Sequence, residues 1–550
     1  MSVNQHWYKE AVIYCVDVGL FADSDGDGCG DFRGLIGRLD YLHRLGATCL
    51  WLNPIHPSPR RDDGYDVTDY YTVDPRFGSL GDFAELLHQA QNRGIRVIID
   101  LVLNHTSNEH PWFVQASSSA DSPYRDWYVW SGSEPADRQQ GIVFPGEQTE
   151  TWTYHRRARA WYYHRFNDYQ PDLNLANRDV RAEIKKIAGF WLQLGVAGFR
   201  LDGVPFIIEL TAPGQSQPPR DFAFLTELRE YVSWRRGDAV LLAEANVSAD
   251  QLPRYAGDES GSANRIHMLL DFLLNDAMVL ALARRTAEPL LVALNATPAL
   301  PPAATWATFL RNHDEIDLSR LTADQREDVF AEFGPDEDMR LYGRGIRRRL
   351  APMLGNDRRR LELAYSLQFS LRGTPVLRYG EEIGMGDDLS LPGREAIRTP
   401  MQWSPNPSAG FTTSAEPTRP VVTRGPFDYR RVNVTAQRRD PSSLLAWFER
   451  LIRAVREIPE AGAGTCRAID EPFAPGVFAH RAEGRTGSVA FLHNLAEEPA
   501  TIDLSSLKAE ADHPTQVFGD QDYGEPLDLG SLRLDGYGYR WIRLARSPVG

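Results

Sequence analysis

Short apolar segments alternate with longer helical segments over the first 380 residues of the chain. Each apolar segment is a continuous run, which is typical of strands buried in a parallel sheet. Glycines stand just before several of them, where helices commonly end. The predicted strands are 11–18, 47–54, 96–104, 198–204, 239–245, 267–274, 306–314 and 374–380. Eight strands with helices between them predict an α/β fold of the (β/α)8 TIM-barrel type.

Two long segments interrupt this alternation. Residues 105–179 are rich in Ser, Pro, Trp, Tyr and His, and we interpret them as an inserted domain after the third strand. Residues 381–439 are rich in Pro, Gly and Arg and are predicted to form a lid-like insertion. Long irregular segments in compact domains are usually functional. The barrel would then consist of residues 1–104 and 180–456.

From about residue 457 the pattern changes to alternating apolar and polar positions, as in 476–481, 487–494 and 539–544. Period-two alternation is typical of antiparallel strands with one buried face. We therefore predict a C-terminal antiparallel β domain, a β-sandwich, over residues 457–550.

Composition narrows the classes of partner. The net charge of −15 argues against binding to nucleic acid or an anionic membrane. No apolar run reaches the roughly 18 residues that span a bilayer, and the first residues carry no signal-peptide core, so we expect a cytoplasmic protein. Cys15, Cys29, Cys49 and Cys466 are widely spaced, which indicates neither a disulfide framework nor a zinc site.

Carboxylates stand at the ends of three different predicted strands: Asp202, Glu244 and Asp314. Burying a carboxylate is costly unless it is paired or used. Arg200 lies two residues before Asp202, on the same face of its strand. An Arg–Asp pair that merely closes a strand would explain one of the three carboxylates, but not all of them. Retaining glycoside hydrolysis requires two close carboxylates, and a third can stabilise the positive charge on the sugar.

The segments 100–105 and 198–202, with Glu244 and the pair His313–Asp314, resemble the four signature regions of the α-amylase family of retaining α-glucosidases and transglucosylases. The resemblance implies that Asp202 is the nucleophile, Glu244 the general acid/base and Asp314 the transition-state stabiliser. It also implies that Asp62 and Tyr65 close a pocket for one glucose. The sugar-binding residues that it implies are Asp62, Tyr65, His105, Arg200, His313 and Arg398.

Within this family the chain most resembles trehalose synthases, on the segments 124–130, 163–174, 347–360, 398–403 and 537–541. The resemblance implies interconversion of maltose and trehalose by intramolecular transglucosylation through a covalent glucosyl-enzyme. The expected partners are small α-glucosides, namely maltose, trehalose and possibly sucrose. It implies no organic cofactor, and self-association into a homo-oligomer is one expectation.

Some positions depart from the trehalose synthase pattern: the loop 211–220, Val247, the first strand at 16–19, and Arg378. We expect these positions to lie where the second sugar binds. The alternative is therefore an α-glucosidase-type hydrolase or transglucosylase acting on maltose, trehalose or sucrose. A third class, a non-catalytic binding subunit, should lack a triad carboxylate or carry a membrane helix, and the sequence has neither mark.

An acidic loop at 23–31 spaces carboxylates at alternate positions around glycines, like the front of an EF-hand. Gly34 replaces the terminal Glu of that motif, so the loop is not an EF-hand. Oxygen ligands at this density favour calcium or magnesium, and a solvated turn is the alternative. The family resemblance implies a structural calcium, with Asp23, Asp25, Asp27, the carbonyl of Cys29 and Asp31 as ligands. Resemblance to trehalose synthases implies a second calcium, held by Asn104, Asp172, Glu209 and the carbonyls of Phe206 and Ile207.

Overall fold

A computed structural model describes residues 6–215, 218–258, 261–484, 487–511, 513–524 and 527–544. At its centre, parallel strands close into a barrel in the order β1-β14-β10-β9-β8-β7-β3-β2. The barrel strands are β1 (Ile13–Val16), β2 (Cys49–Leu52), β3 (Arg96–Leu101), β7 (Gly198–Leu201), β8 (Val240–Ala243), β9 (Met268–Leu270), β10 (Thr305–Thr308) and β14 (Thr374–Arg378). Each lies inside or overlaps one predicted strand, which confirms the TIM barrel.

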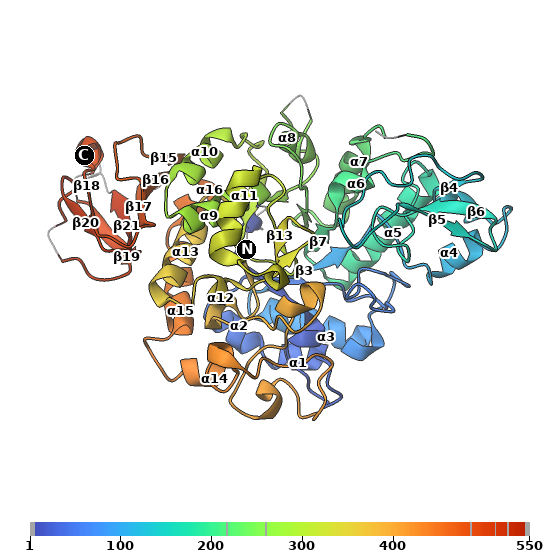
Figure 1. Cartoon of the computed structure of the whole chain (residues 1–550), viewed down its shortest axis with the longest axis horizontal. Coiled ribbons are helices and arrows are strands. Elements are labelled where there is room, and N and C mark those ends of the chain that lie inside the picture. The colour runs from blue at the N-terminus through green and yellow to red at the C-terminus, as the bar shows by residue number, and fades with distance from the viewer. Residues whose placement is uncertain are drawn as a thin grey trace.

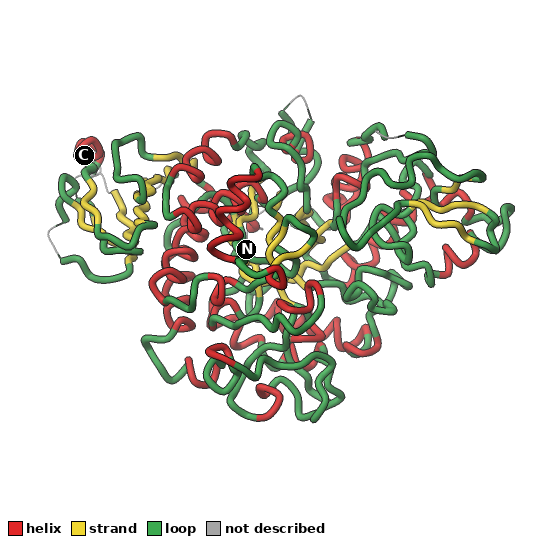
Figure 2. Tube along the Cα trace, viewed as in Figure 1, coloured by secondary structure: helices red, strands yellow, loops and turns green. Residues whose placement is uncertain are grey.

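Helices surround this barrel, as Figure 2 shows. The principal helices are α2 (Leu39–Leu45), α3 (Leu80–Asn92), α5 (Arg178–Leu194), α7 (Ala223–Arg235), α8 (Leu252–Ala256), α9 (Phe272–Arg284), α13 (Arg358–Ser370) and α15 (Leu444–Arg456). The others are α1 (Phe32–Ile36), α6 (Val204–Ile207), α10 (Glu288–Ala296), α11 (Ala323–Phe333) and α12 (Leu350–Met353). Alternate strand residues build two cores: Ile13, Trp51 and Leu242 lie in one, and Tyr14, Leu50 and Leu241 in the other. Because side chains alternate along a strand, the first core fills the barrel and the second packs under the helices.

Several strands are shorter than predicted. The segment 267–274 forms only β9, because Asp271 caps the next helix by accepting a hydrogen bond from the Leu274 amide at 3.0 Å. Similarly, β10 ends at Thr308, so Asp314 stands on the loop beyond it rather than on the strand. Between β1 and β2 the chain forms two helices, α1 and α2, which are divided near Gly37.

The segment 105–179 contains its own antiparallel sheet, in the order β4-β6-β5, and the short helix α4 (Pro111–Ala116). These strands are β4 (Trp130–Ser131), β5 (Trp152–His155) and β6 (Ala160–Tyr163). It projects from one side of the barrel, at the right of Figure 1. A bridge between His105 and Asp172 joins its two ends, so the segment leaves and returns to the barrel at one place.

The C-terminal domain lies on the opposite side, at the left of Figure 1. Helix α16 (Pro459–Ala463) leads into an antiparallel sheet in the order β15-β16-β17-β21-β19, beside a second sheet, β18-β20. The strands are β15 (Thr465–Ala468), β16 (Val477–Glu483), β17 (Ser488–Asn494), β18 (Ala500–Ile502), β19 (Thr515–Gly519), β20 (Leu532–Leu534) and β21 (Tyr539–Leu544). One apolar cluster includes residues of both sheets, among them Leu492, Ile502 and Leu534. The predicted antiparallel β domain is therefore confirmed.

The segment 381–439 consists of loops with short helices: η6 (Glu381–Ile383), η7 (Gly393–Ile397), η8 (Pro407–Gly410), η9 (Gly425–Phe427) and α14 (Val434–Gln437). A further small sheet, in the order β11-β13-β12, follows β10; its strands are β11 (Ile316–Asp317), β12 (Arg340–Leu341) and β13 (Gly345–Ile346). Among the described helices, none is both long enough and apolar enough to cross a bilayer.

Gly198, at the start of β7, provides a test of how closely the barrel is packed. Its φ is 150°, and a Cβ placed there would lie 2.2 Å from the Val240 carbonyl oxygen of the neighbouring strand β8. We expect Gly198→Ala to destabilise the protein by clearly more than the roughly 1–2 kcal/mol of an unfavourable backbone conformation alone. The free energy of unfolding from urea titration measures this loss.

Gly94→Ala is the matched control, because Gly94 also has a positive φ, 71°, but nothing lies within 4 Å of a Cβ there. Equal destabilisation by the two variants would contradict the close packing of β7 against β8.

Candidate active site

The carboxyl ends of the parallel strands meet at one cavity of about 420 Å³. Asp202 follows β7, Glu244 follows β8, and Asp314 lies on the loop after β10. All three line this cavity, together with Asp62, Tyr65, His105 and His313 from the predicted sugar-binding set. The barrel thus brings together residues that are spread over more than 250 positions of the chain.

Arg200 lies at the centre of the charged groups and is fully buried. Its Nη1 donates hydrogen bonds to Asp202 Oδ1 at 2.6 Å and to Asp100 Oδ1 at 3.1 Å, and its Nη2 donates to Glu244 Oε2. Asp202 and Glu244 therefore contact the same guanidinium and must lie close together. Close carboxyl groups, roughly 5–5.5 Å apart, characterise retaining glycosidases.

Asp100 is a buried residue to which the sequence interpretation gave no role. It pairs with Arg200 across the β3–β7 register and accepts hydrogen bonds from the Tyr65 hydroxyl at 2.8 Å and Trp51 Nε1 at 3.1 Å. The Tyr65 hydroxyl also lies 2.6 Å from His313 Nε2, and the two rings are stacked. Asp100 thus positions Arg200 and Tyr65. Its place in the first signature segment was the only signal for it.

Asp314 is surrounded by cations. Arg398 Nη2 donates to its Oδ1 at 2.8 Å, and Arg394 Nη1 lies 2.9 Å from the same oxygen. Arg398 also donates to the His313 carbonyl, and it is not among the residues that line this cavity. Arg394 does line the cavity, and the sequence interpretation missed it. Both arginines come from the irregular segment 381–439, where no periodicity marks a functional residue.

The three carboxylates differ in acidity because their surroundings differ. Burial raises the pKa of Glu244 to about 7 and that of Asp202 to about 6, in both cases against the opposing charge of Arg200. Burial alone would also raise the pKa of Asp314, but Arg394, His313 and Arg398 hold it well below its usual range. Glu244 is therefore the group of the three that most readily keeps a proton.

Hydrogen bonds from neighbouring elements fix the side chains of the remaining predicted sugar-binding residues, Asp62 and His105. Asp62 Oδ2 accepts a hydrogen bond from Gln170 Nε2 of the inserted domain at 2.9 Å. The next residue, Asp63, pairs with Arg398 and Arg419 and is another residue that the sequence interpretation missed. His105 Nε2 lies 3.1 Å from the Tyr65 carbonyl oxygen, and burial lowers its pKa to about 4, so the ring is neutral.

The catalytic-domain family "Alpha amylase, catalytic domain" matches residues 18–332 and 347–461, most of the chain. The chain belongs to the α-amylase family. The family "Sucrose hydrolase-like, C-terminal domain" matches residues 487–543 of the C-terminal domain.

Members of this family resemble the chain over its whole length. The trehalose synthase/amylase TreS of Mycolicibacterium smegmatis is 40% identical, over 100% of this chain and 94% of its own. The trehalose synthase of Thermus thermophilus is 40% identical over 99% of this chain and 56% of its own, and the trehalose-6-phosphate hydrolase of Escherichia coli is 32% identical over 90% and 92%. Among solved structures, an α-amylase from H. orenii is 28% identical with a TM-score of 0.77, covering 98% of this chain and 100% of that one. A MutB variant in complex with the substrate sucrose is 26% identical with a TM-score of 0.78, covering 98% and 99%.

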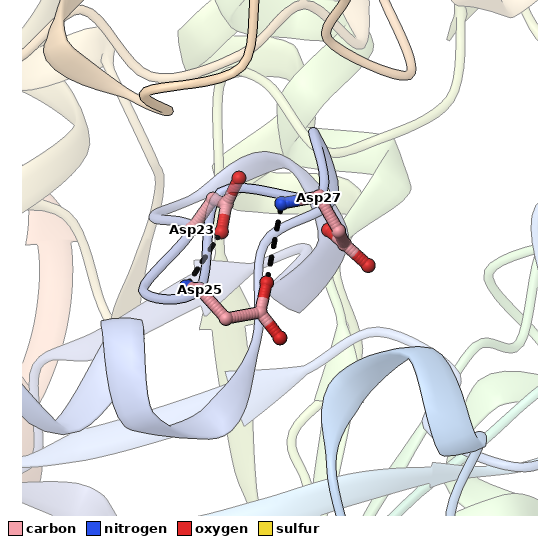
Figure 3. A group of neighbouring side chains, drawn as sticks. All are labelled: Asp23, Asp25 and Asp27. Carbon is pink, nitrogen blue, oxygen red and sulfur yellow. Dashed lines mark hydrogen bonds between the residues drawn. The ribbon is translucent and has the colours of Figure 1, made fainter.

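The acidic loop expected to hold the family's calcium brings Asp23, Asp25 and Asp27 together, with carboxylate oxygens within 4.8 Å of one another (Figure 3). Three carboxylates this close repel each other, and hard oxygen donors suit calcium, so these residues fit the ion. Asp31 lies outside this group. Its carboxylate caps α1 at the Gly34 amide and accepts two hydrogen bonds from Ser24.

The second predicted calcium site fits only in part. Asp172 is buried beside Asn104, and burial raises its pKa to about 7, as expected of a carboxyl group without a full countercharge. Glu209, however, is paired with Arg165 of the inserted domain at 2.5 Å and lies 3.6 Å from Arg220. A calcium ion there would have to share Glu209 with Arg165.

Two of the sequence departures do not lie at the cavity, contrary to expectation. Arg378 is buried and donates to the Asn312 carbonyl, and Asp17 accepts a hydrogen bond from the Gly19 amide; neither lines the cavity. Their side chains bind backbone groups of nearby loops instead: Arg378 binds the loop after β10, and Asp17 caps the turn that follows β1. Asn246, which adjoins Val247, does line it, as does Phe206 of α6, the helix that precedes the loop 211–220.

Proposed function

We propose that this chain is a retaining α-glucoside-acting enzyme that interconverts maltose and trehalose. The observation that carries the proposal is the Asp202–Arg200–Glu244 arrangement in a cavity of sugar size, on a chain that resembles trehalose synthases from end to end. Drug-sized ligands occupy cavities of roughly 300–1,000 Å³, and the 420 Å³ found here is at the small end of that range.

In the first half of the reaction, Asp202 attacks the anomeric carbon of the glucose held near Asp62 and Tyr65. A carbon–oxygen bond to Asp202 forms while the glycosidic bond breaks, and Glu244 gives its proton to the leaving oxygen. The raised pKa of Glu244 suits it to this step. Asp314, held ionised by its arginines, stabilises the positive charge that develops on the ring.

In the second half, the released glucose turns within the cavity. Its anomeric hydroxyl gives a proton to Glu244 and attacks the glucosyl–Asp202 bond, which forms trehalose and frees Asp202. Water must be kept out while this intermediate exists. The inserted domain reaches the barrel over the cavity: Arg344 Nη2 donates to the Val143 carbonyl at 2.9 Å, and the Phe144 and Tyr342 rings are 5.0 Å apart.

Hydrolysis, or transfer to another acceptor, is the second candidate. It is favoured by the loop 211–220, which departs from the trehalose synthase sequence. Arg220 of this loop forms a bridge with Glu209, and Glu209 is paired with Arg165, which lines the cavity. A wall that holds the released glucose less firmly would let water take its place.

Product analysis separates these two functions. Incubation with maltose should give trehalose with little free glucose, and incubation with trehalose should give maltose, because one glucosyl group is exchanged inside the cavity. Quantitative chromatography of both reactions checks this expectation. Glucose as the main product from maltose would identify a hydrolase instead.

Two variants and a control test the catalytic assignments in the same assay. Asp202→Asn and Glu244→Gln should each lower kcat by several orders of magnitude while the thermal unfolding midpoint remains near that of the parent protein. Asp168→Asn makes the same chemical change at an exposed position of the inserted domain and should leave kcat unchanged. Near-parental turnover in either active-site variant would refute the assigned roles.

The pH dependence of kcat/KM follows from the two raised pKa values. Below about pH 6 Asp202 takes up a proton and loses its nucleophilic charge, and above about pH 7 Glu244 loses the proton that it must donate. The profile should therefore be bell-shaped, with its maximum near pH 6–7. Initial rates at low maltose concentration measure it, and a profile that is flat from acid to alkaline pH would exclude this pair.

We also propose that Asp23, Asp25 and Asp27, with the carbonyl of Cys29 and Asp31, hold a structural calcium. A second calcium would be held by Asn104, Asp172, Glu209 and the carbonyls of Phe206 and Ile207, where it would compete with Arg165 for Glu209. Either ion would stabilise a loop, and neither would enter the reaction steps above.

Removal of calcium should therefore lower the free energy of unfolding of the protein more than it lowers the catalytic rate of the protein that remains folded. A ligand that binds only the folded state at a hundredfold excess over its Kd adds about 2.7 kcal/mol to the free energy of unfolding. Adding calcium to chelator-treated protein should raise the unfolding temperature, and Asp25→Asn/Asp27→Asn should abolish most of that rise. Magnesium at the same concentration is the control, and it should raise the unfolding temperature less than calcium does. An unfolding temperature that does not respond to calcium would refute the proposal for the acidic loop.

A further inference from the structure

A groove of about 1850 Å³, larger than the catalytic cavity, lies on another part of the barrel. Its walls are α2 and the segment 403–438, which contains α14; Figure 1 shows these blue and orange elements together at the bottom of the molecule. Hydroxyl-bearing side chains are frequent along it, including Ser404, Ser408 and Thr435. None of the residues that we assign to the reaction lines this groove.

Two rigid aromatic rings form part of its wall. The Tyr41 hydroxyl donates to the buried carboxylate of Glu382 at 2.5 Å, and Trp403 Nε1 donates to the Phe21 carbonyl at 2.6 Å. The rings meet edge to face, with centroids 5.1 Å apart. Both rings are thus fixed at their polar ends and cannot easily turn away.

Each ring supports an arginine. The guanidinium of Arg38 lies 4.2 Å from the centroid of Trp403, and that of Arg438 lies 5.2 Å from Tyr41. Arg44, one helical turn after Tyr41 on α2, also lines the groove. Arg38 is half-buried, and no side-chain hydrogen bond or ion pair joins these three guanidinium groups to another described residue. Arg438 repels Arg38 and, after burial, contributes to lowering the pKa of Arg38.

The carboxylates that line the groove form no ion pair with these arginines in the described part of the chain, although the charge of Asp40 also acts on Arg44 at longer range. Asp40 pairs with Arg93 at 2.7 Å, and Asp387 pairs with Arg348 at 2.9 Å. Asp23 belongs to the acidic loop, and Asp388 accepts hydrogen bonds from Ser390. Glu416 is exposed, and it forms no ion pair in the described part of the chain. Guanidinium groups that lack an ion-pair partner repel one another. A bound anion would relieve this repulsion by attracting each of them.

We propose that Arg38, Arg438 and Arg44 form a binding site for a phosphate group, and that the hydroxyl-lined groove beside them accepts the sugar of a phosphorylated sugar. Arginine is suited to this role because its planar fork of donors matches the oxygens of a phosphate. The aromatic platforms hold two of the forks in place, so little side-chain entropy is lost on binding. The site is separate from the catalytic cavity and does not depend on the proposed reaction.

Isothermal titration of the full chain with inorganic phosphate, at ionic strength held constant with chloride, tests the proposal. Saturable binding is expected for the parent protein. Arg38→Met/Arg438→Met should weaken it at least tenfold while maltose turnover stays unchanged. Arg156→Met/Arg157→Met removes the same charge from two exposed arginines of the inserted domain and should change the Kd less than twofold.

A variant that keeps the arginines provides an independent readout. Glu449, on α15, is close enough for its charge to act on Tyr41, as Arg438 does. Its negative charge would oppose a phosphate beside Arg438, so Glu449→Gln should tighten phosphate binding. Glucose 6-phosphate should bind more tightly than inorganic phosphate, because the groove also holds the sugar. Glucose alone should not displace bound phosphate. No saturable binding of phosphate or of glucose 6-phosphate to the parent protein, or equal weakening by the two double variants, would overturn the proposal.

Discussion

The arrangement around Arg200 is the constraint on which the site depends. One fully buried guanidinium bonds to Asp100, Asp202 and Glu244, three carboxylates from three adjacent strands or their ends. Removing four charges from water is costly, and their mutual attraction offsets this cost only if the geometry is well defined. A closed barrel supplies that geometry, because its strands cannot shift relative to one another without breaking their register. The distance between the nucleophile and the acid is therefore set by the fold rather than by flexible loops.

A second network of ion pairs joins the segment 381–439 to the carboxylates at the ends of the barrel strands. Arg394 and Arg398 come from the segment 381–439, and both contact Asp314, while Arg398 also contacts Asp63 beside the sugar pocket. Arg419, from the same segment, contacts Asp63 as well. These ion pairs are buried, so each is strong when complete and costly when one partner is lost. They explain why a long, irregular segment is ordered: its arginines neutralise carboxylates that the reaction needs.

The inserted domain completes the cavity from the other side. It supplies Gln170 to Asp62, and its Phe144 and Val143 contact Tyr342 and Arg344 of the barrel. The pocket is thus closed by elements that are far apart in sequence and that meet only over the strand ends. Such a cover is what an intramolecular transfer requires, since water would otherwise compete with the released glucose.

The sequence by itself determined the class of fold and the central chemistry. Eight apolar strands with helices between them leave few topologies other than the barrel, and a carboxylate at the end of a buried strand has little meaning other than function. Asp202, Glu244 and Asp314 could thus be proposed from local patterns and family resemblance. Only the tertiary structure showed Asp100 as the partner of Arg200, and Arg394 and Asp63 as parts of the ion-pair network, because their roles lie in contacts across 80 to 356 residues. It also decided that Arg398 binds Asp314 and the His313 carbonyl without lining the cavity, and that Arg378 does not line it either. Those positions depend on where strands end and loops cross, which no local periodicity encodes.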